Sequence, residues 1–136
     1  GMAEPWLRLA AVQSQRGDVQ AAIATLERAR TLAPRDPMVL ADLGAALNEA
    51  GSFAAAEAVL RESLALRATA DAYNNLGVAL NGLGRPSDAV GQFGAALALN
   101  SASAEAWFNL GVAQAMLGDV TQARTAAVRT FSATYH

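Results

Sequence analysis

Apolar residues recur along the chain at the spacing of amphipathic helices, and the complete pattern returns about every 34 residues. In each period an aromatic residue or leucine is followed three residues later by leucine and then by a small residue, as at Trp107, Leu110 and Gly111. This spacing puts the three side chains on one face of a helix. A glycine follows at residues 17, 51, 84 and 118, where a residue free to adopt positive φ ends a helix well. The pattern predicts four helix–turn–helix hairpins.

Residues that favour the start of a helix stand at matching places in each period. Ser, Thr and Asp accept hydrogen bonds from the free backbone N–H groups of a first helical turn, and Pro is tolerated there. The second helices are expected to start at Asp18, Ser52, Arg85–Pro86 and Asp119, and the following first helices at Asp36–Pro37, Thr69 and Ser103.

These columns resemble the tetratricopeptide repeat, whose signature is W-x2-L-G-x2-Y…A-x3-F…P. The closest matches are Trp107–Gly111 with Ala123, and Tyr73–Gly77 with Ala89 and Phe93. The second tyrosine of the signature is replaced in every period, by Gln13, Leu47, Leu80 and Gln114. The resemblance implies an all-α fold, a right-handed α–α superhelix (a solenoid) of about eight antiparallel helices.

The resemblance covers residues 3–136, which we expect to form a single domain. Its repeats are predicted at 3–36, 37–69, 70–103 and 104–136. We interpret residues 1–2 as a tag remnant followed by the start of the protein. Such a domain buries its core between neighbouring hairpins rather than around one centre.

Composition argues against several classes of function. Alanine makes up roughly a quarter of the chain, as suits closely packed helices. Cysteine is absent, so disulfides and thiolate metal sites are excluded. The only histidine is His136, so common nucleophile–base pairs cannot be assembled. We therefore predict no catalytic residues, no metal, no cofactor and no enzymatic activity.

Charge and hydropathy bear on partners and location. Ten arginines and twelve acidic residues give a net charge of −2, and they form no basic stripe. Nucleic-acid binding is therefore not expected. No apolar run is long enough to insert into a membrane. We expect a cytoplasmic location, and the periplasm stays open if a signal peptide was removed.

The resemblance also implies that the first helices line a concave groove that binds a protein or peptide partner. The expected partner-binding residues are Leu7, Asp42, Asn74, Asn75, Val78, Phe108, Asn109 and Val112. Phe108 is the expected anchor, since aromatic side chains dominate many interfaces. Trp6, Tyr73 and Trp107 stand in the packing column and are expected in the core.

Two further features of the predicted groove concern the chemistry of the partner. Asn75 and Asn109 share one column, and amides can both donate to and accept from an extended peptide backbone; the alternative is that Asn is simply common there. Acidic residues also outnumber Arg8 on this face, namely Glu4, Asp42, Glu49, Asp71 and Glu105. This favours a neutral or basic partner, unless the face is only solvated.

The last helix predicts a second binding surface. Val128, Phe131 and Tyr135 would form an exposed apolar strip that docks on another copy or another protein, or that was covered in a longer protein. The predicted function is a non-catalytic adaptor or scaffold. The alternatives are a structural element that self-assembles through this helix, giving a homo-oligomer, and a regulatory repeat domain of a larger enzyme.

Overall fold

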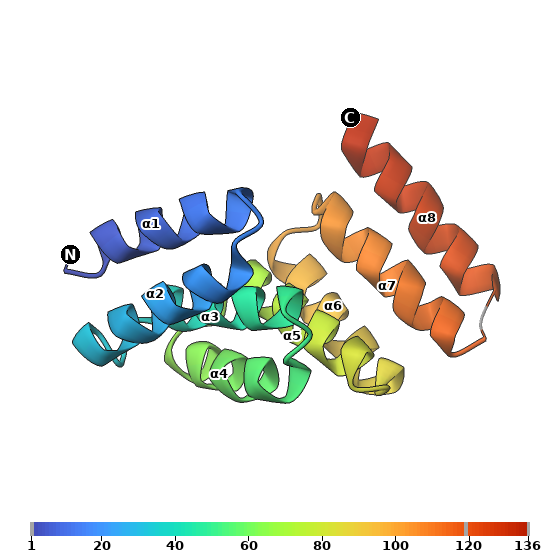
Figure 1. The fold of residues 1–136 in the computed structure, drawn as a ribbon. Helices are drawn as coiled ribbons and strands as arrows, with labels where there is room; N and C mark the ends of the chain where they lie inside the picture. The colour runs from blue at the N-terminus through green and yellow to red at the C-terminus, as the bar shows by residue number, and fades with distance from the viewer. Residues whose placement is uncertain (1, 119, 136) are drawn as a thin grey trace. The chain divides into compact units, whose positions relative to one another are not determined.

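The computed structural model describes residues 2–118 and 120–135, and for residues 120–123 and 135 it describes the backbone alone. The described residues form helices and turns without a strand, which confirms the all-α prediction. In chain order the helices are α1 (Glu4–Gln15), α2 (Val19–Leu32), α3 (Pro37–Glu49), α4 (Phe53–Leu66), α5 (Ala70–Gly82), α6 (Pro86–Leu99), α7 (Ala104–Met116) and α8 (Val120–Tyr135) (Figure 1).

Consecutive helices pair as antiparallel hairpins, α1 with α2, α3 with α4, α5 with α6 and α7 with α8 (Figure 1). The chain divides into two compact units, Gly1–Ala68 and Thr69–His136. In the first unit α3 packs on α2 and touches α1, and in the second α7 packs on α6 and touches α5. The division falls within one residue of the predicted boundary between repeats 37–69 and 70–103. A single domain over residues 3–136 stays a prediction.

Each hairpin turn contains a glycine in the left-handed region. Gly17, Gly51, Gly84 and Gly118 have φ values of 78°, 78°, 73° and 80°. In the first three turns the next residue donates its N–H to the carbonyl five residues earlier, as from Arg85 to Leu80 at 2.8 Å. The bond satisfies a carbonyl that has no partner within the helix. The predicted role of the spaced glycines is confirmed.

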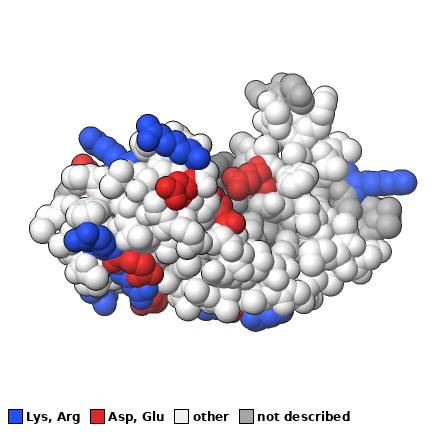
Figure 2. Space-filling model, in the orientation of Figure 1, with Lys and Arg blue, Asp and Glu red and all other residues white. Residues whose placement is uncertain are grey.

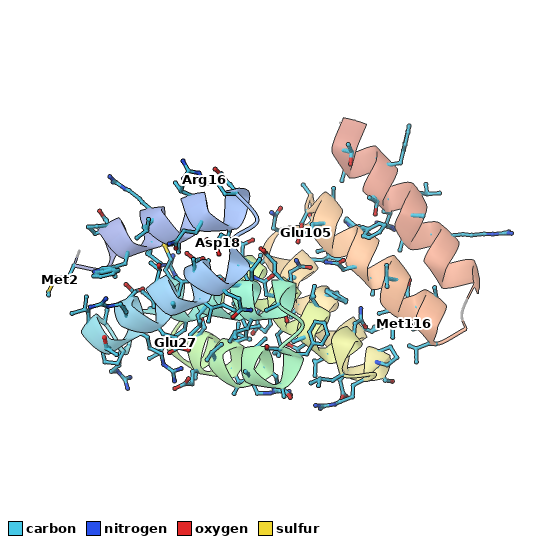
Figure 3. The ribbon with its side chains drawn as sticks, in the orientation of Figure 1. Met2, Arg16, Asp18, Glu27, Glu105 and Met116 are labelled. Atoms are coloured by element: carbon cyan, nitrogen blue, oxygen red, sulfur yellow. The ribbon has the colours of Figure 1, made fainter. Side chains whose placement is uncertain are left out.

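Polar side chains cap most of the predicted helix starts. The side chains of Asp18, Asp36, Thr69 and Ser103 accept from the backbone N–H groups of Ala21, Met38, Ala72 and Ala106. Figure 3 labels Asp18 beside the turn between α1 and α2. Ser52 stands at the start of α4, but the expectation that its side chain caps the helix was wrong, since it makes no such bond. Asp119 lies outside the described residues.

Two of the hairpins pack closely at a position where the first helix has a glycine and therefore no side chain. A carbon added at Gly44 would run into the side chain of Leu60, and one added at Gly77 would run into the ring of Phe93. Both Leu60 and Phe93 are completely buried. The glycine that follows the repeated leucine therefore lets a large apolar side chain of the second helix reach the first helix, as predicted.

We expect Gly77→Ala to lower the free energy of unfolding by about 1–3 kcal/mol, because the added methyl group overpacks the contact with Phe93. Gly91→Ala is the matched control, since an added carbon at Gly91, inside α6, meets nothing within 4 Å. That change should raise the free energy of unfolding by about 1 kcal/mol, the helix-propensity difference between the two residues. Urea denaturation of both variants tests the contact, and equal effects would contradict it.

Candidate functional site

In the first unit a pocket of about 180 Å³ lies between the helices α1, α2 and α3. Its lining residues are Ala10, Ala11, Ser14, Leu26, Asp42, Ala45, Ala46 and Glu49. Asp42 and Glu49 stand two helical turns apart, so that α3 presents both carboxylates on one wall. Both residues are exposed. The pocket therefore combines an acidic rim with an apolar floor.

The other predicted residue of this unit, Leu7, has a different environment. It is half-buried and packs against the cluster of Ala3, Ala29 and Val39. Trp6 packs against the same cluster, and the guanidinium of Arg28 lies 5.4 Å from the centre of its ring. Leu7 thus lies at the contact of α1 with α2 and α3, and only part of its surface reaches solvent.

In the second unit α5 and α7 bring the predicted asparagines together. The side-chain amide of Asn109 donates to Oδ1 of Asn74 at 3.1 Å. Asn74 is only 6% exposed, so it contacts the protein more than solvent, whereas Asn75 and Asn109 are half-buried. The bond leaves Oδ1 and the second N–H of Asn109 for another partner. Asn74 therefore orients the amide of Asn109.

An apolar stripe runs along α7, starting at the residue before Asn109. Phe108 is 60% exposed, and Val112 and Met116, four and eight residues further on, are exposed as well. Met116 lies at the C-terminal end of α7 in Figure 3. Val78, the predicted residue on α5, is half-buried. Phe108 is therefore a surface residue, available to a partner.

The hairpin of α7 and α8 carries a second pocket, of about 230 Å³, which sequence reasoning missed. It is almost entirely apolar and is lined by Phe108, Gly111, Val112, Ala115 and Ala127. The signal was present in the repeat columns. Ala127 occupies the column that holds the buried side chains of Leu26, Leu60 and Phe93 in the preceding repeats. The small side chain leaves space that a larger one fills elsewhere.

The predicted apolar strip on α8 is exposed where it is described. Val128 and Phe131 are 68% and 66% exposed, and the side chain of Tyr135 lies outside the described part. Whether this strip binds another molecule stays a prediction.

Trp107 joins α7 to the preceding loop and to α8. Its indole N–H donates to the carbonyl of Ser101 at 2.9 Å, and the guanidinium of Arg129 lies 5.0 Å from its ring centre. Trp107, Ser101 and Arg129 also line a pocket of about 410 Å³, together with Ala102, Ser132 and Ala133. The ring is half-buried, so Trp107 serves packing while one side of it reaches solvent.

Charges are sparse on the side of the molecule that Figure 2 shows, where most of the surface carries no charged side chain. Glu4 and Arg8 on α1 form an exposed ion pair at 4.0 Å. Among the described residues no group of three or more acidic, histidine or cysteine side chains is placed to hold a metal ion. None of the described helices has the length and apolar character needed to cross a membrane.

Comparison with known proteins identifies the repeat. Three tetratricopeptide-repeat family models match residues 3–46, 38–68 and 74–131. Among curated proteins, none matches the sequence significantly.

Solved structures share the fold at low sequence identity. MamA 41-end from Desulfovibrio magneticus RS-1 is 22% identical with a TM-score of 0.84, over 98% of this chain and 76% of that one. TTC0263, a thermophilic TPR protein in Thermus thermophilus, is 22% identical with a TM-score of 0.87, over 96% and 73%. A chain of the APC/C hetero-tetramer Cut9–Hcn1 is 20% identical with a TM-score of 0.90, and 98% of this chain covers 27% of it. The fold class is the all-α tetratricopeptide-repeat solenoid.

We expect Asn74→Ala and Asn109→Ala to show a coupling of about 0.5–1.5 kcal/mol in a double-mutant cycle for unfolding, because each change removes the same hydrogen bond. Asn75→Ala, one position away on α5, is the control for Asn74→Ala and should show a smaller coupling with Asn109→Ala. Chemical denaturation of the variants measures both values. Additive effects of the first pair would mean that Asn74 does not orient Asn109.

Proposed function

Since the chain belongs to the tetratricopeptide-repeat family, we propose that it is a non-catalytic protein-interaction scaffold whose first helices bind a segment of a partner protein. The observation that carries this proposal is on α7, where the exposed Phe108 and Asn109, whose amide Asn74 orients, are consecutive residues. A peptide needs an apolar anchor and a backbone hydrogen bond to be held in one register. These adjacent residues supply one of each.

Asn75 extends the same chemistry onto α5. It stands in the repeat column of Asn109 and is half-buried, as Asn109 is. Two amides from neighbouring first helices suit an extended segment, since each can donate to and accept from its backbone. The preference for side chains then comes from the apolar stripe of α7. A bound segment with an aliphatic or aromatic residue fits this surface best.

The pocket of the first unit favours positive charge in the partner. An arginine or lysine has a long apolar stem and a charged head, which match the alanine floor and the carboxylates of Asp42 and Glu49. Complementary charges across an interface add specificity and speed the association of the partners. We therefore propose a neutral or basic segment as the partner.

The groove residues are tested with a peptide array of neutral, basic and acidic sequences, followed by calorimetric titration of the bound peptides. We expect Phe108→Ala to weaken binding about tenfold or more, since it removes the aromatic anchor. Phe131→Ala is the matched control, because Phe131 on α8 is exposed to a similar extent. Equal losses for the two variants, or no binding peptide at all, would contradict the proposal.

Replacing the acidic rim tests the charge preference separately. Asp42→Asn together with Glu49→Gln should weaken the binding of basic peptides about tenfold and reduce its dependence on salt, because the changes remove the attraction and keep the shape. Neutral peptides should bind as before. If basic peptides lose nothing, the acidic residues only keep the face solvated.

A further inference from the structure

The apolar pocket on α7 and α8 repeats a site that the first unit contains in complete form. Residues Gly111, Val112, Ala115 and Ala127 stand at the repeat positions of Ala10, Ala11, Ser14 and Leu26. The latter four line the pocket of the first unit, and there α3 supplies the opposite wall through Asp42, Ala45, Ala46 and Glu49. The pocket on α7 and α8 therefore has two walls of such a junction, and among the described residues no helix lines it in the place that α3 has in the first unit.

Helix α1 exposes the surface that such a following helix would present. Leu9 and Val12 are 46% and 43% exposed. Their repeat equivalents on α7, Leu110 and Ala113, are buried, and α7 packs on the preceding hairpin. The equivalents on α3 are Leu43 and Ala46, which are buried as well. The first helix of the chain thus shows the apolar side that α3 and α7 cover.

The sizes of two residues match across these ends. Inside the first unit the large Leu26 and the small Ala46 line the same pocket. At the two ends the order is reversed, since α8 has the small Ala127 and α1 has the larger Val12. A larger side chain on the incoming helix fills space that a small one leaves, which keeps a junction closely packed.

We propose that α1 of a second copy packs against α7 and α8, as α3 packs against α1 and α2, so that copies associate head to tail. Val12 of the second copy lies over Ala127 in this arrangement, and Leu9 adds to the apolar contact. The two surfaces are different, and the interface is therefore heterologous. Each added copy exposes a new open end, so the assembly grows with concentration.

Sedimentation velocity of the complete chain between about 1 μM and about 1 mM, the range in which weak protein pairs dissociate, tests the association. We expect the mean mass to rise with concentration. Val12→Glu and Ala127→Glu should each lower the association constant more than about a hundredfold, because each would bury an unpaired charge. Both sites are exposed in the single chain, and circular dichroism checks that each variant keeps its helices.

Mixing the two glutamate variants tests the direction of the contact. The Val12→Glu protein keeps its surface on α7 and α8, and the Ala127→Glu protein keeps its α1, so an equal mixture should form a one-to-one dimer and nothing larger. The double variant should stay monomeric. A mixture that stays monomeric would overturn the proposal, and so would Val12→Glu protein that associates like the unchanged chain, since the contact would then join two α8 surfaces.

The reversed sizes provide a second test that depends on packing alone. Ala127→Leu should weaken association about tenfold by overpacking against Val12, and adding Val12→Ala should restore it, because the pair then matches Leu26 and Ala46. Association that ignores both changes would overturn the proposal, as would an unchanged chain that stays monomeric throughout. Phe108 lines this pocket and also belongs to the proposed peptide surface, so peptide binding is measured on the Val12→Glu protein, which keeps Phe108, the asparagines, Asp42 and Glu49 and does not associate with itself. Peptide binding by that variant then reports on the proposed function separately from association.

Discussion

The second and third hairpins of this protein depend on a close approach between two helices at a position that has no side chain. Gly77 admits the ring of Phe93, and Gly44 admits Leu60. The contact brings the helix backbones together and gives a hairpin one compact, largely alanine-lined body. Two helices cannot cover all of their own apolar surface, however, so every hairpin needs a neighbour. The proposed binding surfaces of the chain are the places where a hairpin has an apolar face that no neighbouring helix covers in the described structure.

The fold could be read from the sequence because its rules are local. A glycine at a fixed interval, a cap residue beside it and a leucine three residues after an aromatic side chain each act within one hairpin. Those positions recur in four repeats, so that signals that are weak in a single repeat reinforce one another. The single error among the described caps was Ser52, whose side chain makes no capping bond. The choice of partner for a hydroxyl depends on geometry that the sequence pattern does not contain.

The candidate site was harder to predict, because residues in one column differ in what covers them. Leu7, Asn74 and Phe108 share a repeat position, yet Leu7 packs in a cluster, Asn74 is buried against Asn109 and Phe108 faces solvent. The amide pair needed the structure, since it joins two helices. The small size of Ala127 at a position that holds Leu26, Leu60 and Phe93 elsewhere can be read from the sequence, but only the structure shows that an apolar pocket lies beside it.

The hairpin turns have a consequence for how such a chain can change in length. Arg85 donates to Leu80 in one helix, and its carbonyl accepts from Ala89 in the next, so a single residue between the helices is hydrogen-bonded to both. An inserted or deleted residue at this turn would break hydrogen bonds on both sides. Between α6 and α7 the hydrogen bonds are divided among residues instead, since Ser103 accepts from Trp107 in α7 but donates its own N–H to Asn100, which lies outside α6. Insertions and deletions are therefore expected to accumulate between hairpins, and the turns within them keep a constant length over evolutionary time.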